Sequence, residues 1–578
     1  MPDAALNPAE AAAAAAQLRV NDCIDAGQNF RLEAGAGAGK TYSLVTSLKR
    51  LISERGTAYI QKGKKVACIT YTQVARDEIL KEIDQHPAIA VDTIHAFCWS
   101  VMSRFQGQLR ALIPQIERNA AKVAEAGGLG NRRVEYSLGF FGIDEDKVTL
   151  YHDDVPELMA KLMDFPKFRR QLADAYPVLF IDEYQDTDEH FASAIAKHFL
   201  EDGTGPLVGL FGDHWQTIYR DDFGLTAYPN VEGIEKGANF RSVPAVVDVL
   251  NRLRPELAQA IKDPHAPGEA RAFHTNAYAG ERTNDRNSKH DLLPAAARDH
   301  LAALRARLEQ DGWNFSPDLT KILMLTHNAL AEEQGYPTIV EVFRDRKEAF
   351  AKKEDKTIEF FADVLEPMCL AYENGRYGEM FRILGRPQQI KSHADKATWQ
   401  RNMAALKNLR DTGTVGDVLD HLKATRRPAL PDPVSRRETE LATLVLEDGQ
   451  EEPSYLRRHR GLRGVPYEEI AKLTKFIEGS TPFATQHSVK GAEFENVLVV
   501  LGGGWNHYNW PQMLELMQTG ALTDKNRKGF YRARNLFYVG LSRPKKRLAV
   551  LLTQKLPGDA LSTLDRLFGA HAVHSVTL

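Results

Sequence analysis

The chain has 578 residues and a formal net charge of −3, and no run approaches the ~18 apolar residues that cross a bilayer. Its length exceeds the roughly 250–300 residues at which a single core stops growing, so we expect two large domains with insertions. The near-neutral charge means that any nucleic-acid path must be a local basic groove. The four cysteines form no CxxC pair. This excludes a common type of zinc site and favours a reducing cytoplasm.

Short apolar runs that end in polar or small residues recur along the chain and predict buried parallel strands. The runs cover residues 66–71, 178–181, 207–211, 322–325, 497–501 and 548–552. Helical stretches such as 40–52 and 74–83 lie between them, and this alternation predicts a doubly wound α/β fold. Ligand groups are then expected just beyond the C-terminal ends of the strands.

Two long segments lack this alternation of strand and helix. Residues 97–175 are polar and helix-rich, and residues 336–478 are charged, mostly helical and interrupted by prolines such as Pro431, Pro433 and Pro453. Both segments are predicted to be mainly helical insertions into the sheet domains.

A glycine-rich loop follows the short predicted strand 30–33 and opens a helix. It consists of Ala34, Gly35, Ala36, Gly37, Ala38, Gly39, Lys40 and Thr41. Glycines let backbone amides turn toward phosphates without Cβ clashes, and the helix N-terminus favours an anion. Lys40 is predicted to reach the β- and γ-phosphates of ATP, and the Thr41 hydroxyl to ligate Mg2+. Ala34 departs from the glycine that usually opens this pattern.

A pair of carboxylates follows the fully apolar predicted strand 178–181. Asp182 and Glu183 are expected at the tip of that strand. Asp182 is predicted to hold magnesium, partly through water, and Glu183 to orient and deprotonate the attacking water. The alternative is an ordinary acidic turn, but the phosphate loop upstream favours the catalytic interpretation.

The loop AGAGAGKT, the box DEYQDT and the spacing between them resemble superfamily 1 helicases of the UvrD, Rep and PcrA type. Six further motifs stand in the order of that family. They are ITYTQ at 69–73, DTIHAF at 92–97, GDHWQTIY at 212–219, NFRS at 239–242, QHSVKGAEF at 486–494 and YVGLSR at 538–543. The resemblance implies an α/β protein with two RecA-like parallel-sheet domains and two mainly helical insertions. It places one sheet domain at 1–96 and 176–262 and the other at 263–335 and 479–578, with insertions at 97–175 and 336–478.

The resemblance also implies roles for residues around ATP. Gln216 is expected to sense the γ-phosphate, and Arg241 and Arg543 to act as arginine fingers that meet the nucleotide when the two domains close. Phe240 is expected to stack on the adenine and Glu493 to contact the ribose. Gln17, whose spacing from the loop is slightly long, is a candidate for reading the adenine.

Single-stranded DNA binding needs stacking platforms and phosphate contacts. By resemblance, Tyr71 and Tyr219 are expected to stack on bases. Thr72, His95 and His487 are expected to bond backbone phosphates. The alternative for each tyrosine and histidine is core packing with a satisfied polar tip.

One departure affects the predicted DNA grip. The family usually continues after the third motif with a tryptophan that stacks on DNA, whereas this chain has Asp221 and Asp222. Stacking contributes about 1–3 kcal/mol per base, so the grip should be weaker. Two basic clusters outside the motifs are either a DNA path, a partner surface or solvated faces. They are Arg457, Arg458, Arg460 and Arg463, and Lys525, Arg527, Lys528, Arg532 and Arg534.

Two functions therefore stay open. The first is a three-prime to five-prime helicase or translocase acting on single-stranded or tailed DNA. The second is a DNA-sensing ATPase that regulates a partner nuclease and unwinds little. The chain resembles the compact helicase-like subunit of Gabija antiphage defence systems, which implies an ATPase–nuclease partner; residues 325–328 and 334–337 carry part of this resemblance. A fused nuclease domain is not expected because the chain ends soon after the last motif, and an inactive module is not expected because the ATP residues are complete. No membrane association is expected.

Overall fold

The computed structural model describes most of the chain, which divides into two compact units. The described residues are 6–137, 141–201, 204–217, 228–284, 289–324, 331, 333–346, 349–384, 392–445, 451–479, 481–485, 491–502 and 508–577. Unit 1 comprises 1–270, 507–547 and 558–570, and unit 2 comprises 271–506, 548–557 and 571–578. No helix in these described ranges is long and apolar enough to cross a membrane.

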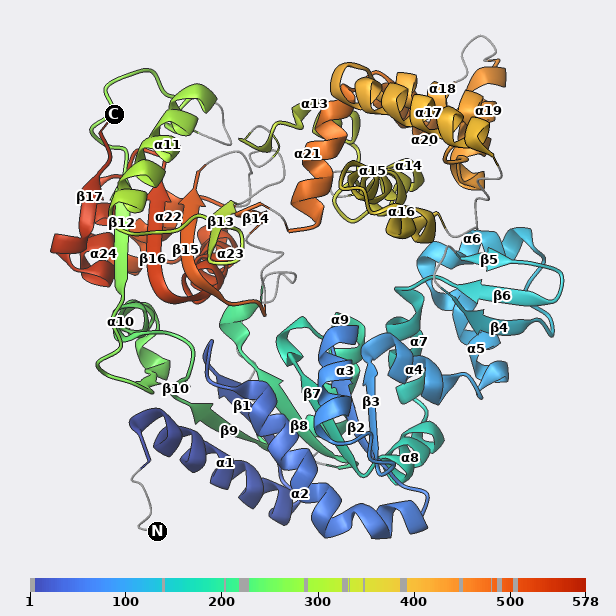
Figure 1. The fold of residues 1–578 in the computed structure, drawn as a ribbon. Coiled ribbons are helices and arrows are strands. Elements are labelled where there is room, and N and C mark those ends of the chain that lie inside the picture. The colour runs from blue at the N-terminus through green and yellow to red at the C-terminus, as the bar shows by residue number, and fades with distance from the viewer. Residues whose placement is uncertain are drawn as a thin grey trace. The chain divides into compact units, whose positions relative to one another are not determined.

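Unit 1 is built on a six-stranded sheet with the order β3-β2-β7-β8-β1-β9, in which every neighbouring pair is parallel (Figure 1). The strands are β1 (Asn29–Ala34), β2 (Val66–Thr70), β3 (Ile89–Thr93), β7 (Val178–Asp182), β8 (Leu207–Gly212) and β9 (Val231–Lys236). Strands β1, β2, β7 and β8 are buried along their whole length, which is why they read as continuous apolar runs in the sequence.

Helices cover both faces of this sheet. Helices α1 (Pro8–Ala26), α2 (Lys40–Gln61) and α3 (Gln73–Glu82) share a core with Phe30, Phe180 and Phe211. Helix α9 (Glu189–Ile195) and the turn η3 (Ala196–Leu200) share a second core with Ile181 and Leu210. Successive strand residues point to opposite faces, so one strand serves both cores.

Residues 97–175 are mainly helical and pack against the second core. The helices are α4 (Ile94–Met102), α5 (Gln106–Leu112), α6 (Glu117–Glu125), α7 (Asp154–Met163) and α8 (Pro166–Ala175), with the turn η1 (Ile113–Gln115). The segment also holds a small sheet of β4 (Arg133–Tyr136), β5 (Gly142–Ile143) and β6 (Lys147–Leu150). The sequence pattern does not predict this sheet, because strands of two to four residues are too short to show an alternation of apolar and polar residues.

The remaining elements of unit 1 follow the sheet or come from late in the chain. They are η2 (Tyr184–Asp186), η4 (His214–Gln216), β10 (Ala238–Asn239), α10 (Pro244–Leu253), η5 (Pro255–Leu257), β11 (Ala260–Ile261), α22 (Trp510–Thr519), α23 (Asp524–Leu541) and α24 (Gly558–Phe568). Strand β16 (Pro544–Leu552) begins in unit 1 and continues into unit 2.

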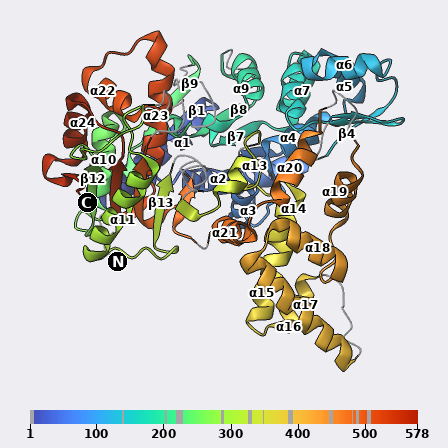
Figure 2. The ribbon, with the colours of Figure 1, turned by 90° about the horizontal axis from the view of Figure 1, so that it is seen from above.

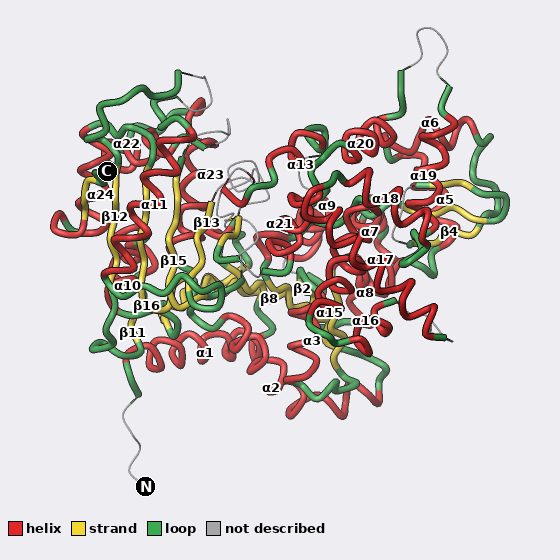
Figure 3. The backbone as a smooth tube through the Cα atoms, turned by 45° about the horizontal axis from the view of Figure 1, so that its top comes forward, coloured by secondary structure: helices red, strands yellow, loops and turns green. Residues whose placement is uncertain are grey.

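Unit 2 contains the second six-stranded sheet, with the order β14-β13-β15-β16-β12-β17 (Figure 3). Its other strands are β12 (Glu269–His274), β13 (Thr320–Met324), β14 (Phe483–Thr485), β15 (Phe494–Leu501) and β17 (Val573–Ser575). Helix α11 (Pro294–Gln310) packs on it through Leu301, Leu304 and Leu308. Pairs β13–β14, β13–β15 and β12–β17 are parallel. The α/β class with two parallel-sheet domains of RecA-like type is confirmed.

Residues 336–478 form a helical body with its own core around Tyr336, Phe361 and Tyr467 (Figure 2). Its elements are α13 (Pro337–Val342), α14 (Lys356–Phe360), η6 (Phe361–Leu365), α15 (Glu366–Glu373), α16 (Tyr377–Ile383), α17 (His393–Thr412), α18 (Val415–Thr425), α19 (Asp432–Thr443), α20 (Ser454–Arg463) and α21 (Tyr467–Ile477). The prolines that interrupt the sequence pattern begin helices, since Pro431 and Pro453 are N-caps and Pro433 lies in the first turn of α19.

Candidate nucleotide-binding site

The glycine-rich loop joins the end of β1 to the start of α2. Gly37 and Gly39 have φ values of 78° and 73°, a region that favours glycine. A Cβ atom at Gly35 would lie only 2.5 Å from the side-chain nitrogen Nε2 of Gln259. Ala34 is the last residue of β1 and is fully buried, so this position needs no glycine. The loop therefore has the conformation that a phosphate-binding backbone requires.

Lys40 lies at the start of α2 with its side chain only 12% exposed, and it forms an ion pair with Glu183. Its Nζ lies 3.0 Å from Oε1 and 2.9 Å from Oε2 of that carboxylate. Burial alone would lower the pKa of Lys40, but the carboxylates of Glu183, Asp213 and Asp182 outweigh burial and raise it. Lys40 is therefore a fixed positive charge beneath the loop.

The two acidic residues at the tip of β7 differ in environment. Burial, followed by repulsion from Glu183, raises the pKa of Asp182 to about 7. Its Oδ1 atom is buried and accepts no hydrogen bond from the described part of the chain. Glu183 has a φ of 50°, an uncommon value for a residue with a side chain, and Gln185 donates to its carboxylate. A buried carboxylate oxygen of this kind suits a divalent cation, so Asp182 fits a magnesium site, and the role of Thr41 as a second ligand stays a prediction.

Gln216 is held in a hydrogen-bonded chain that reaches the phosphate loop. Its Nε2 donates to Asp213 Oδ2 at 2.8 Å, and the Tyr538 hydroxyl donates to the same oxygen at 3.2 Å. The amide of Ala36 donates to Tyr538 at 3.0 Å. Arg543 donates to Gln216 Oε1 at 3.3 Å. Unit 1 thus connects the loop, the predicted γ-phosphate sensor and a predicted arginine finger.

Arg543 is almost fully buried at the end of α23. Burial, followed by repulsion from Arg241, lowers its pKa to about 9. Arg241 donates from Nη1 to the carbonyl of Ser542 at 2.9 Å, and this contact brings the two arginines close together. Two neighbouring guanidinium groups create a strongly positive region, which is what a developing phosphate charge requires.

The motif around Arg241 is fastened to the loop by one side chain and one backbone amide. The side-chain amide of Asn239 donates to the carbonyl of Ala36 at 3.2 Å, and the backbone amide of Phe240 donates to the carbonyl of Gly37 at 2.9 Å. The Phe240 ring remains 38% exposed beside the loop. An exposed ring held at this point is available for stacking on a base.

A buried charge network supports Asp213 from the other side. Arg254 lies 2.6 Å from Asp213 Oδ1 and 3.4 Å from Glu33 Oε2, and Glu33 also contacts His214 at 2.9 Å. Although the carboxylates and His214 are close enough to hold a metal, Arg254 already supplies the cation there. Burial raises the pKa of Asp213, but Arg254 and Lys40 outweigh burial and lower it to about 2. Arg254 belongs to none of the sequence motifs, so no local pattern predicts its place beside Asp213 and Glu33.

Two predicted nucleotide contacts lie apart from this network. Gln17 on α1 donates to Asn21 at 3.2 Å and to Ser47 at 3.0 Å, so its amide contacts the second turn of α2. Glu493 precedes β15 and belongs to unit 2, so it is not among the residues that unit 1 brings together. Both assignments stay predictions.

The predicted DNA residues differ in exposure and partners. Tyr71 follows β2 and is 47% exposed, whereas the Thr72 hydroxyl caps α3 by accepting from Ala75 at 3.1 Å. His95 stacks on His152, with ring centroids 3.4 Å apart. Tyr219 and His487 lie outside the described residues, as do Asp221, Asp222 and residues 325–328. The DNA-binding roles stay predictions.

The first basic cluster is largely neutralised by carboxylates. Arg457, Arg460 and Arg463 lie 3.8, 3.2 and 2.6 Å from Glu451, Glu452 and Glu438. Arg458 pairs with Asp345. In the second cluster, Arg534 stacks over Trp215 with its guanidinium carbon 3.6 Å from the ring centre. These contacts favour structural roles for the paired arginines.

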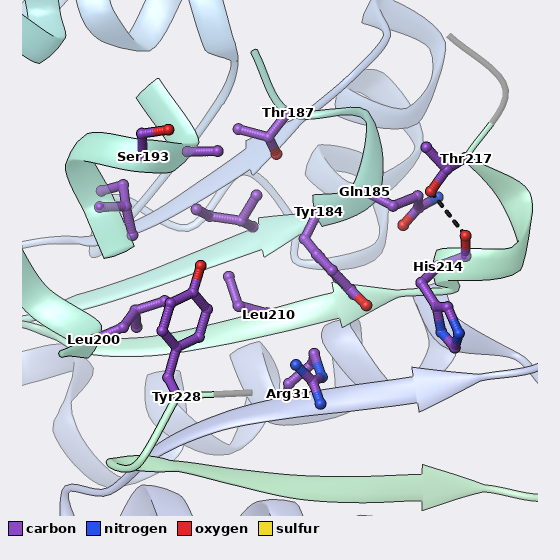
Figure 4. A pocket seen from close by; sticks show the side chains of 13 residues that line it. Arg31, Tyr184, Gln185, Thr187, Ser193, Leu200, Leu210, His214, Thr217 and Tyr228 are labelled. Carbon is purple, nitrogen blue, oxygen red and sulfur yellow. Dashed lines mark hydrogen bonds between the residues drawn. The ribbon is translucent and has the colours of Figure 1, made fainter. Parts of the chain in front are cut away.

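A cavity of about 140 Å³ lies on the α9 face of the first sheet (Figure 4). Figure 4 shows the Tyr184 side chain extending across the sheet toward Arg31 of β1. Its hydroxyl donates a hydrogen bond to the carboxylate of Glu33 on the same strand. The lining includes Arg31, Gln185 and His214 but none of the loop residues 34–41. The cavity therefore adjoins the charge network rather than the phosphate loop.

Comparisons with known proteins found three similarities. Residues 21–222 match the model of an AAA domain family. The chain is 22% identical to the Gabija protein GajB of Bacillus cereus (strain HuB5-5), in an alignment that covers 94% of this chain and 96% of that protein. Among solved structures, the helicase nonstructural protein 10 of an arterivirus aligns at 9% identity with a TM-score of 0.27. The alignment covers 96% of this chain and 63% of the helicase, so the chain spans less than two thirds of its length. The predicted similarity to a Gabija protein is confirmed.

Proposed function

We propose that this protein is a helicase-type ATPase of an antiphage defence system, in which ATP hydrolysis is coupled to single-stranded DNA. The observation that carries the ATPase proposal is the chain of contacts joining the loop to Tyr538, Asp213, Gln216 and Arg543. The similarity to GajB along 94% of the chain supports the defence role.

Each group near the loop has a role in hydrolysis. Lys40 and the loop amides would bind the phosphates, and Thr41 and Asp182 would hold Mg2+, which shields phosphate charge when bound. Bound phosphate would compete with Glu183 for Lys40, and this would free the Glu183 carboxylate to accept the proton of the attacking water. Gln216 would contact the γ-phosphate, and Arg241 and Arg543 would neutralise charge that develops on it.

We further propose that the protein translocates along DNA in the three-prime to five-prime direction. Bases would stack on Tyr71 and Tyr219, and backbone phosphates would be bound by Thr72, His95 and His487. We propose single-stranded or tailed DNA as the nucleic-acid partner. Movement would come from a change in contacts between the two sheet domains during each ATP cycle. The proposal includes one sheet domain at 1–96 and 176–262, a second at 263–335 and 479–578, and insertions at 97–175 and 336–478.

A second function is a DNA-sensing ATPase that regulates a partner ATPase–nuclease and unwinds little. The sequence Asp221-Asp222 favours it, because acids replace the stacking tryptophan of the family. The pairing of Arg463 with Glu438 and Asp420 also favours it, since two carboxylates occupy donors of this guanidinium group.

The test is ATP hydrolysis by the purified full chain, with and without single-stranded DNA and with the candidate nuclease. We expect hydrolysis that DNA stimulates. No hydrolysis under any of these conditions would remove the proposal. Strand displacement measured in the same samples separates the two functions, because only the translocating helicase unwinds a tailed duplex efficiently by itself.

A further inference from the structure

Lys236 is a buried lysine beside the phosphate loop that none of the helicase-like motifs contains. It is the last residue of β9, and the parallel pairing with β1 sets it opposite Ala34, where the loop begins. Its side chain is 1% exposed. The sheet register therefore brings a second lysine to the same loop as Lys40.

The ammonium group of Lys236 joins the two ends of the first turn of α2. Its Nζ donates to the carbonyl of Gly39 at 2.9 Å and to the hydroxyl of Ser43 at 2.8 Å. The same Gly39 carbonyl accepts the helical hydrogen bond from the Ser43 amide at 3.2 Å. Lys40 and Thr41 lie within this turn, so Lys236 fixes the backbone that positions both.

The described part of the protein supplies no carboxylate partner for the charge of Lys236. No ion pair with a carboxylate is formed by Lys236 within the described ranges, and burial lowers its pKa to about 8. It also lies at the N-terminal end of α2, where the helix dipole repels a cation. Burying an unpaired charge is costly unless an anion is near. Lys40, in contrast, is paired with Glu183.

We propose that Lys236 is a positioning residue of the nucleotide site, which fastens the first turn of α2 and adds a second positive charge for bound phosphates. The inference rests on the proposed function, because it requires that the loop binds a nucleotide. Its ligand class is a nucleoside diphosphate or triphosphate, and it acts on the phosphates rather than on the base. The anionic ligand supplies the compensation that the protein lacks at this position.

The experiment measures binding of ADP, labelled fluorescently on the ribose, to the full chain with Mg2+. Lys236→Gln keeps an N–H donor and removes the charge, Lys236→Arg keeps both, and Lys62→Gln removes an exposed charge at the far end of α2. We expect Lys236→Gln to raise the Kd about ten-fold, equivalent to about 1.4 kcal/mol. Lys236→Arg should stay within about three-fold of the natural chain, and Lys62→Gln within about two-fold.

Further measurements separate positioning from general structural support. Lys236→Gln should raise KM for ATP about ten-fold, while kcat stays within about three-fold of the natural chain. Unlabelled adenosine should compete with the labelled ADP equally well in Lys236→Gln and in the natural chain. Equal ADP affinity in Lys236→Gln and Lys62→Gln would overturn the inference. A loss of adenosine binding in Lys236→Gln as large as its loss of ADP binding would overturn it as well. If Lys236→Gln does not fold, Ser43→Ala replaces it, with an expected rise in Kd of about three-fold; no change there overturns the inference. A natural chain that binds no ADP would remove the proposed function itself.

Discussion

The ammonium of Lys40 lies within 3.0 Å of both carboxylate oxygens of Glu183. The residue proposed to bind phosphate and the residue proposed to accept a proton are therefore direct partners. An arriving γ-phosphate must exchange this pair for a Lys40–phosphate contact, which couples nucleotide binding to release of the base.

Removing each partner should give a different defect. Lys40→Ala should abolish measurable nucleotide binding because it deletes the buried cation of the loop. Glu183→Gln should still bind ATP but lose turnover by at least about 100-fold, since the amide cannot accept a proton. Binding and steady-state hydrolysis check both results, with the exposed acid Glu189→Gln as control. Normal turnover in Glu183→Gln would show that the base is misassigned.

Arg254 should be essential for stability because it is shared by two buried acids. Arg254→Met leaves Asp213 and Glu33 buried without their common cation, so we expect a loss of about 3–5 kcal/mol in the free energy of unfolding. Chemical denaturation measures the free energy of unfolding of Arg254→Met, and Arg170→Met, which changes an exposed arginine, is the control. Equal stability of the two variants would mean that the acids find other partners.

The stacked pair of His95 and His152 should make the fold sensitive to acid. Burial, followed by repulsion from His152, lowers the pKa of His95 from 6.5 to about 4. Between pH 6.5 and about 4, His95 binds a proton in the unfolded chain but not in the folded chain. The stability that a neutral His95 allows is therefore fully present above pH 6.5 and is lost as the pH falls toward 4. His95→Phe keeps a ring and removes the titration.

Melting temperatures from pH 7.5 down to 4.5 check this sign. The difference between the natural chain and His95→Phe should change in favour of the variant as pH falls. The exposed His190→Gln serves as the control and should follow the natural chain. Parallel melting curves for all three proteins would contradict a buried neutral His95.

The isolated chain should unwind a tailed duplex poorly. Asp221 and Asp222 stand where the resembled family has a stacking tryptophan, and each lost stack removes about 1–3 kcal/mol of grip. Strand displacement under ATP concentrations that give full hydrolysis measures this. Hydrolysis in the same tube is the control, because it shows that the motor is active. Robust unwinding by the chain alone would refute the prediction.

Local sequence was enough for the α/β class and the parallel strands, whereas the roles of the residues at the glycine-rich loop stay predictions. Lys40 follows a strand-loop-helix pattern, and Asp182 ends an apolar run, so short-range patterns locate both. The small sheet at 133–150 was missed because its strands are too short, and Arg254 and Lys236 were missed because neither lies in a motif.

The sequence by itself therefore determined two local frames, the strand-loop-helix segment that holds Lys40 and Thr41 and the strand end that holds Asp182 and Glu183. Only the tertiary structure decided which charges are compensated. Lys40 is paired with Glu183 across 143 residues of chain, Asp213 is paired with Arg254, and Lys236 has no anionic partner among the described residues. Charge compensation depends on distance and burial, and sheet register and helix packing set these between residues far apart in the sequence.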